Sequence, residues 1–242
     1  MLAVFKKEIR SFFTSPIGYL IIGLFLVLNG LFLWVFKGQF NILDYGFADL
    51  SNFFLLSPWV FLFLIPAITM KSFSEERKLG TLELLLIKPI STLKVILGKF
   101  GGAFVLCVLA IIPTIIYVFT ISNLGIIKAN YDLGIILGSY FGLLFLIATY
   151  TSIGVFASSL SENQILSFIL GIVLCFIVFY GFEALATLFS DGDTSELIKS
   201  FGLKAHFNSI ARGIIDIRDI IYFLSLTCFF LYMTIIRLKN LS

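Results

Sequence analysis

Six long apolar segments dominate this sequence and constrain its fold more than any other feature. The segments cover residues 17–36, 53–70, 100–122, 134–160, 164–188 and 220–236. Each is close to or above the roughly 20 residues with which a helix crosses a hydrocarbon core of about 30 Å. The sequence therefore predicts an all-α, polytopic membrane protein with six transmembrane helices.

The composition agrees with this class of protein. Of the 242 residues, 60% are hydrophobic and 13% are charged, whereas a soluble domain carries about 25% charged residues. One soluble core could not hide this much apolar surface, so residues 1–242 are expected to form a single transmembrane domain. Cys107, Cys175 and Cys228 all fall inside apolar segments, and we interpret them as small buried hydrophobic residues rather than as a metal site or a disulfide.

Lysine and arginine lie mostly on one side of the predicted membrane. Eleven of the 17 are at the two ends of the chain or in residues 71–99, namely Lys6, Lys7, Arg10, Lys71, Arg77, Lys78, Lys88, Lys94, Lys99, Arg237 and Lys239. The two short loops on the other side hold only Lys37 and Lys128. Because cytoplasmic loops carry an excess of Lys and Arg, both termini and residues 71–99 are predicted to be cytoplasmic, and residues 190–219 extracytoplasmic.

The N-terminal stretch LAVFKKEIRSFF predicts a short helix in the membrane interface. Its apolar positions are Leu2, Phe5, Ile9 and Phe12, and its charged positions are Lys6, Lys7, Glu8 and Arg10. This spacing puts the two sets on opposite faces of a helix. We expect residues 1–16 to form an interfacial helix, the alternative being a solvated start to the first span. Ser15 and Pro16 indicate where that span begins.

Residues 74–99, SEERKLGTLELLLIKPISTLKVILGK, contain a short apolar run that cannot cross a membrane. Residues 81–88 would form about 12 Å of helix. The spacing of Ser72 and Glu75 is that of a capping box, which predicts that a charged helix begins at Ser72. Gly80 is expected to end that helix with a positive φ, and Thr81 to begin a second helix that stops before Pro89.

The second short helix would be apolar around most of its circumference. Its apolar residues are Leu84, Leu85, Leu86 and Ile87. At about 100° per residue they leave no broad polar face to lie on a lipid surface. Such a helix needs a groove, and the groove belongs either to the same chain or to a partner protein.

No nucleotide-binding loop or catalytic constellation is recognisable. The dipeptide Gly98-Lys99 is followed by Phe100, not by the Ser or Thr that a phosphate-binding loop uses to hold Mg²⁺. His206 is the only histidine, and we interpret it as a solvated loop residue. The sequence therefore predicts no ATPase site, no bound cofactor, no metal and no nucleic-acid partner.

A few residues within the spans are candidates for helix packing or for a transport pathway. Gly134, Gly138 and Gly142 recur every four residues, which allows close helix contacts within the chain or at a dimer interface. Asn29 could hydrogen-bond to another span. Glu183 is interpreted as an interfacial carboxylate, with a pathway role as the alternative.

The stretches FKKEIRSFFTSPIGYL and EERKLGTLELLLIKPIS, followed by GK before the third span, resemble an ABC transporter permease of the type-2 exporter class. Within this class, the sequence looks like the permease subunit of the gliding-motility ABC transporter. The residues that carry the class resemblance are Glu75, Glu76, Gly80, Thr81, Glu83, Pro89 and Lys99.

The resemblance implies that residues 75–89 contain a coupling helix that docks on a separate cytoplasmic ATPase, which binds ATP and Mg²⁺. The implied contact residues are Glu75, Glu76, Arg77, Gly80, Thr81, Glu83, Leu84, Leu85, Leu86, Ile87 and Pro89. It also implies a second permease copy or a homologous permease, an auxiliary gliding membrane subunit, the bacterial inner membrane, and an outward cap over residues 190–219.

Two other functions stay open from the sequence alone. One is a secondary transporter or channel, although ion-coupled carriers usually place ionisable groups in mid-membrane and these spans hold almost none. The other is a scaffold that transmits force across the membrane without transport. The sequence does not identify a substrate.

Overall fold

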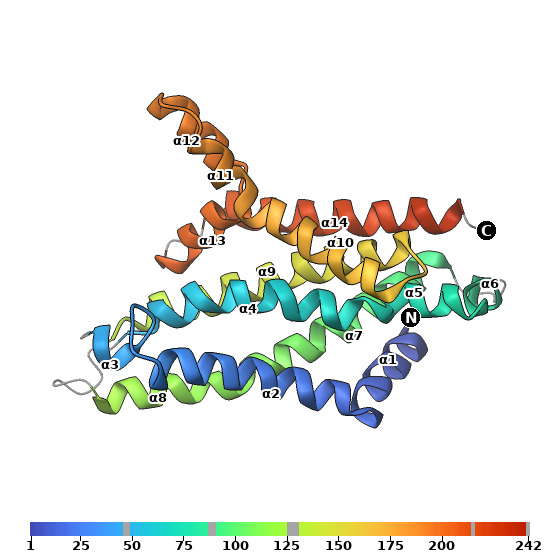
Figure 1. Cartoon of the computed structure of the whole chain (residues 1–242), viewed down its shortest axis with the longest axis horizontal. Helices are drawn as coiled ribbons and strands as arrows, with labels where there is room; N and C mark the ends of the chain where they lie inside the picture. The colour runs from blue at the N-terminus through green and yellow to red at the C-terminus, as the bar shows by residue number, and fades with distance from the viewer. Residues whose placement is uncertain (46–48, 87–90, 125–130, 214–215, 241–242) are drawn as a thin grey trace.

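The computed structural model describes residues 1–45, 49–86, 91–124, 131–213 and 216–240, and these residues form helices joined by short connections, without a strand among them. Six helical segments within them are long and apolar enough to cross a membrane, and they form one elongated bundle (Figure 1). Their bounds are Pro16–Val35, Ser51–Lys78, Thr92–Leu124, Leu133–Leu160, Gln164–Ala186 and Ile217–Lys239. The predicted all-α, polytopic membrane fold is confirmed.

Several spans contain more than one helical element. In chain order, the spans comprise α2 (Pro16–Gly30) with the π-helical turn η1 (Leu31–Val35), α4 (Ser51–Thr69) with α5 (Lys71–Lys78), α7 (Thr92–Ile111) with the 3₁₀ turn η2 (Ile112–Thr114) and α8 (Ile115–Leu124), α9 (Leu133–Leu160), α10 (Gln164–Phe176) with the π-helical turn η3 (Ile177–Gly181) and α11 (Phe182–Ala186), and α14 (Ile217–Lys239). The other described helices are α1 (Leu2–Thr14), α3 (Ile42–Tyr45), α6 (Thr81–Leu86), α12 (Gly192–Ser200) and α13 (Leu203–Ala211).

Short polar residues fix where spans begin. The carboxylate of Asp132 accepts hydrogen bonds from the backbone N–H groups of Gly134 and Ile135 at the start of α9. Asn163 and Asp216 cap α10 and α14 in the same way. Each cap satisfies donors that the first turn of a helix leaves unpaired. Pro16 is the first residue of α2, as predicted.

Helix α9 is the centre of the bundle, because it packs against α4, α5, α7, α10, α13 and α14. Small residues allow this crowding. At Gly154 an added Cβ would lie 2.1 Å from Oγ1 of Thr69 in α4, so the two helices could not approach as closely with any larger residue there. The large side chains of Phe25, Phe53, Phe61 and Tyr150 are fully buried around this centre.

The predicted helix start at Ser72 is wrong. Helix α4 runs through Met70, which has helical φ and ψ, directly into α5, and Ser72 is buried. The combined helix has 28 residues, about 42 Å at 1.5 Å per residue. This exceeds a hydrocarbon core of about 30 Å, so the charged α5 forms the end of the helix that extends beyond the core. Gly80 follows with φ of 66°, as expected.

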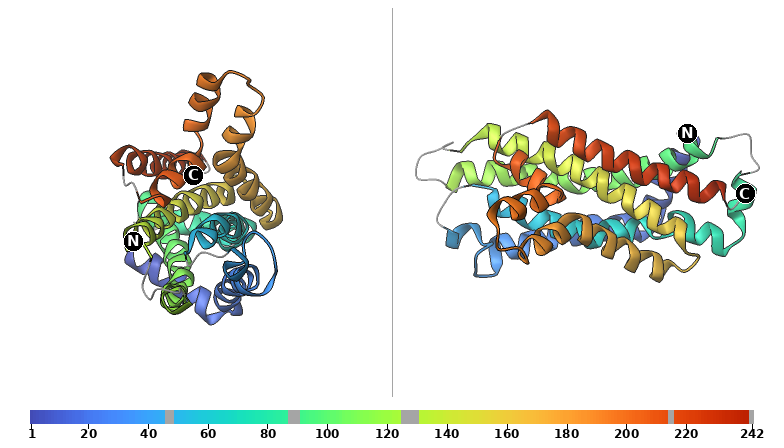
Figure 2. Two further views of the ribbon diagram at one scale, coloured as in Figure 1. Left: turned by 90° about the vertical axis from the view of Figure 1, so that its left-hand side faces the viewer. Right: turned by 90° about the horizontal axis from the view of Figure 1, so that it is seen from above.

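Residues 190–219 carry two helices in place of a simple loop. Helix α12 forms an arm with α11 that projects from the side of the bundle (Figures 1 and 2). Helix α13 returns to the bundle and packs on α9. At the start of α12 the hydroxyl of Thr194 donates to Asp191 at 2.6 Å, which lowers the pKa of that exposed carboxyl.

Candidate functional site

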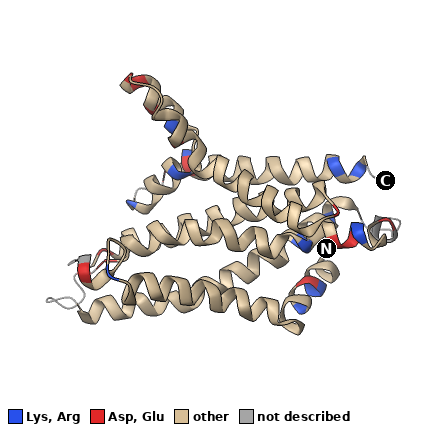
Figure 3. Ribbon diagram, viewed as in Figure 1, with Lys and Arg blue, Asp and Glu red and all other residues tan. Residues whose placement is uncertain are grey.

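Charged side chains gather at the end of the bundle that holds both termini. Figure 3 shows Lys and Arg of α1, α5 and the last turns of α14 at this end. Helix α1 folds back against the start of α7, and α5 lies beside both α4 and α9. Three segments distant in the sequence therefore meet here: the N-terminal helix, the end of the second span and the beginning of the third.

Lys99 of α7 is the centre of this junction. Its side chain is 3% exposed, and its Nζ lies 3.0 Å from Oε1 of Glu8 in α1 and 3.0 Å from Oε1 of Glu76 in α5. The same ammonium lies 5.2 Å from the centre of the fully buried Phe73 ring. A buried ammonium is stable only when it is paired, and here both carboxylates come from other helices. We call Glu8, Glu76 and Lys99 the junction triad.

The junction triad is nearly closed to solvent, and the neighbouring Lys7 balances its excess negative charge. The side chains of Glu8 and Glu76 are 14% and 15% exposed. Lys7 adds a fourth charge 3.4 Å from Glu76, but its side chain is 68% exposed. Such an exposed pair contributes little to stability. Removing any one member of the buried triad, in contrast, is expected to destabilise the protein strongly.

Three glycines of α7 allow α1 to pack closely against that helix. An added Cβ would lie 2.8 Å from Cβ of Val4 at Gly98, and 2.6 Å from Cβ of Glu8 at Gly102. At Gly101 it would lie 3.2 Å from the ring of Phe5. The close approach lets the short Glu8 side chain reach Lys99. Gly98 and Gly102 have the four-residue spacing typical of closely packed membrane helices, and this sequence signal was overlooked.

Helix α1 presents Val4, Phe5 and Glu8 to the glycines of α7. The prediction that Leu2, Phe5, Ile9 and Phe12 form the apolar face of an interfacial helix stays a prediction. Glu8 faces inward because Lys99 offers it a buried partner. Among the residues of the predicted helix, Lys6, Lys7 and Arg10 are exposed, while Phe5, Ile9 and Phe12 are partly exposed.

A second set of contacts connects α5 to the last turn of α9 and to the loop that follows it. One guanidinium nitrogen of Arg77 donates to the carbonyl oxygen of Ser159 at 2.9 Å, and the other lies 3.2 Å from Glu162. The side chain of Arg77 is 13% exposed. Arg77 attaches α5 to α9, and the junction triad attaches it to α7 and, through Lys99, to α1.

Helix α6 extends from this junction on a two-residue turn. Gly80 adopts φ of 66°, and the hydroxyl of Thr81 donates to the carbonyl oxygen of Glu76 at 3.2 Å. Leu82 is buried in a small apolar cluster with Phe73, Val95 and Ile96, whereas Glu83 and Leu79 are exposed, as is Thr81. Among the described side chains of α6, that of Leu82 is buried against its own chain.

The remaining predicted contact residues can be placed only in part. Glu75 lies in α5 and is half-buried. Ile87 and Pro89 lie outside the described residues, and so do the side chains of Leu84, Leu85 and Leu86, whose backbone ends α6. Their contact with a partner stays a prediction.

The residues singled out within the spans contact this chain's own helices. Added Cβ atoms at Gly138 and Gly142 would lie 3.2 Å and 3.0 Å from Ile210 of α13, whereas Gly134 meets only its own Asp132. Asn29 is fully buried, donates to the carbonyl oxygen of Phe25 at 2.8 Å and lies 3.4 Å from the hydroxyl of Ser57 in α4.

An ion pair and a hydrogen bond also secure the opposite end of the bundle. Glu183 of α11 lies 2.6 Å from Nζ of Lys204 in α13. Nδ1 of His206 lies 2.6 Å from Asp219 of α14, and its ring stacks on Tyr222. The interpretation of His206 as a solvated loop residue is wrong, since it lies in α13 and joins α13 to α14. No group of three or more His, Cys, Asp or Glu within the described part of the chain could hold a metal ion.

A comparison of the sequence with protein-family models identifies the family of this chain. The family model of ABC-2 family transporter proteins matches residues 2–227, which include the whole junction. The chain belongs to the ABC-2 transporter family. It is therefore a multi-pass membrane permease subunit, and the family implies an ABC ATPase as its partner. A comparison with curated proteins found no match.

Proposed function

We propose that this permease couples ATP hydrolysis by a separate cytoplasmic ATPase to export across the membrane, and that the ATPase docks on α6 and the adjoining surface of α5. The proposal rests on one observation: the buried ammonium of Lys99 is paired with both Glu8 and Glu76. These pairs connect the helix that leads into α6, the helix that follows it and the N-terminal helix.

The path from α6 to the spans is short. Glu76 and Lys99 flank α6 on its two sides in sequence and are bound to each other. A force applied to α6 therefore acts on α5 and α7 together, and through Glu8 on α1 as well. Such a connection lets a displacement at a cytoplasmic partner shift several spans as one unit. ATP and Mg²⁺ would be bound by the partner and not by this chain.

Reconstitution with the ATPase tests this function. In proteoliposomes that contain permease and ATPase, we expect ATP hydrolysis several-fold faster than with the ATPase alone, because docking completes the working complex. A secondary transporter or channel would leave the ATPase rate unchanged. Equal rates with and without the permease would therefore contradict the proposal. ATPase stimulation without any transported substrate would favour the force-transmitting scaffold.

The proposed orientation places both termini and α6 in the cytoplasm of a bacterial cell, at its inner membrane. It is supported by the Lys and Arg residues at this end of the bundle (Figure 3) and by the excess of such residues in cytoplasmic loops. A reporter fused at Asn240 is expected to read cytoplasmic, and one inserted at Asp193 extracytoplasmic. The opposite result at both positions would remove the basis for docking at α6.

The finer assignment to gliding motility rests on the resemblance of the sequence to the gliding permease. It adds a second permease copy or homologous permease and an auxiliary membrane subunit to the proposed complex. Deletion of this chain from a gliding bacterium that carries it should abolish surface spreading, and normal spreading would exclude the assignment.

A further inference from the structure

A partly open cavity of about 330 Å³ lies at the end of the bundle opposite the termini, between α4, η3 and α13. Its wall includes Trp59 and Phe179 as apolar surfaces, and the side chains of Gln39, Asn52, Lys204 and Asn208 as polar ones. Phe179 comes from the π-helical turn η3, a kind of turn that recurs at functional sites.

Asn52 makes this cavity unusual. Its side chain is 4% exposed, yet its Nδ2 has no hydrogen-bond partner. Buried amide donors in native proteins are almost always paired, because an unpaired donor has lost its water without compensation. A donor of this kind in a cavity wall indicates that an acceptor atom belongs there.

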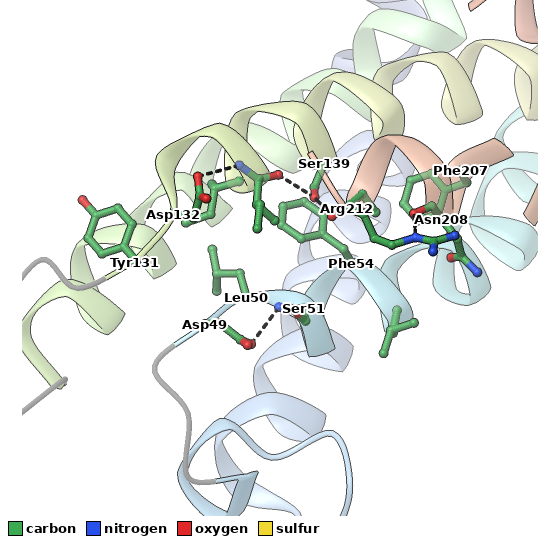
Figure 4. Close-up of a pocket in the computed structure, with 14 residues that line it drawn as sticks. Asp49, Leu50, Ser51, Phe54, Tyr131, Asp132, Ser139, Phe207, Asn208 and Arg212 are labelled. Atoms are coloured by element: carbon green, nitrogen blue, oxygen red, sulfur yellow. Dashed lines mark hydrogen bonds between the residues drawn. The ribbon is translucent and has the colours of Figure 1, made fainter. Parts of the chain in front are cut away.

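An adjoining cavity of about 370 Å³ lacks such a donor. The two cavities share Phe207 and Asn208 in their walls, and Figure 4 shows the second one. There Asp49 accepts from the N–H of Ser51, Asp132 caps α9, and the hydroxyl of Ser139 donates to the carbonyl oxygen of Ala211. The unpaired donor therefore points to the Asn52 cavity and not to its neighbour.

The chemistry of the Asn52 cavity favours an uncharged ligand. In the described part of its wall the charged group is Lys204, which is already paired with Glu183 at 2.6 Å, so little net charge remains to attract a phosphate. The amides of Gln39, Asn52 and Asn208 can each donate and accept hydrogen bonds. The rings of Trp59 and Phe179, 5.5 Å apart and edge to face, supply an apolar wall.

We propose that this cavity binds a neutral sugar unit. A pyranose ring has hydroxyl groups around its edge and C–H groups on its faces, which matches amides beside aromatic rings. Asn52 Nδ2 donates to a hydroxyl oxygen of the sugar, and a C–H face of the ring packs on Trp59. A role for this site in cargo recognition rests on the proposed export function, but the binding itself does not.

Trp59 can report on this site directly. The chain has two tryptophans, and Trp34→Phe leaves Trp59 as the only emitter. The full-length variant is placed in phospholipid nanodiscs without glycoside detergent, and glucose and N-acetylglucosamine are added as probes. We expect a saturable change in Trp59 emission with one or both sugars. Inorganic phosphate and tetra-alanine are expected to cause none.

The variant Asn52→Leu, in the same background, separates a ligand donor from a structural defect. Sugar binding is expected to weaken about fivefold, the effect of one lost hydrogen bond. The thermal midpoint is expected to hold or rise, since an unpaired buried amide is removed. Asn123→Leu is the matched control, because that amide donates to the carbonyl oxygen of Phe119 away from the cavity.

Three results would overturn the proposal. They are no saturable response to either sugar, an equal response with Asn52→Leu, or saturation with phosphate or tetra-alanine instead. Each is measured without an ATPase. Failure here would therefore leave the export function intact, and loss of ATPase stimulation would leave this binding site intact.

Discussion

Replacing Lys99 with methionine is expected to remove most of the stimulation of the partner ATPase by this permease. The change leaves the carboxylates of Glu8 and Glu76, which are 14% and 15% exposed, without the buried ammonium that pairs with both of them. Breaking a buried ion pair by removing one partner typically costs about 3–5 kcal/mol. Helix α1 should then separate from α7, and force on α6 should no longer reach the spans.

The measurement compares ATPase stimulation in proteoliposomes with the thermal midpoint of the purified permease. Lys7→Met is the matched control, because Lys7 contacts the same Glu76 at 3.4 Å but is 68% exposed. An exposed pair contributes less than about 1 kcal/mol, so this control should keep both properties. Full stimulation by Lys99→Met would show that the junction triad plays no part in coupling.

A third variant distinguishes a coupling role from a merely structural one. The triple replacement Glu8→Met, Glu76→Met and Lys99→Met removes every charge of the triad. Replacing a whole buried ion group by hydrophobic residues of similar volume is often neutral for stability, so the midpoint should recover. If stimulation stays low while stability returns, the ion pairs themselves transmit the movement. Recovery of both would reduce the triad to a structural role.

The spans could be predicted from sequence because their signal is local. A membrane fixes both the length and the apolar character of a crossing helix, so six apolar runs suffice to give six helices. The start of α5 could not be predicted in this way. Ser72 and Glu75 have capping-box spacing, but the preceding turn was already helical, and an established helix continues more easily than a new one begins.

The junction triad was beyond the reach of sequence reasoning because its members are far apart in the chain. Glu8, Glu76 and Lys99 meet only after α1 has folded back onto α7. Lys99 itself was noted for its resemblance to a family pattern, with no physical reason attached. The pair His206 and Asp219 was missed for the same cause, since nothing in the sequence indicates that α13 returns to the bundle.

Replacing Leu85 with aspartate is expected to release the ATPase from the permease without removing the permease from the membrane. Leu85 belongs to α6, a helix too short to span and held to its own chain through Leu82. The remaining leucines of α6 are predicted to enter a groove on the ATPase. An aspartate there would bury an unpaired charge, and a loss of about 2 kcal/mol, typical of an interface hot spot, weakens binding about thirtyfold.

Co-purification measures this effect, with the ATPase recovered per permease compared between the wild type and Leu85→Asp. Leu188→Asp is the control, because it makes the same change on a side chain that is 76% exposed at the opposite end of the bundle. It should retain the ATPase at the wild-type ratio. Retention by Leu85→Asp as well would show that the ATPase docks elsewhere. If Leu85→Asp permease disappears from the membrane, α6 instead packs within its own fold, and the groove that it fills belongs to this chain.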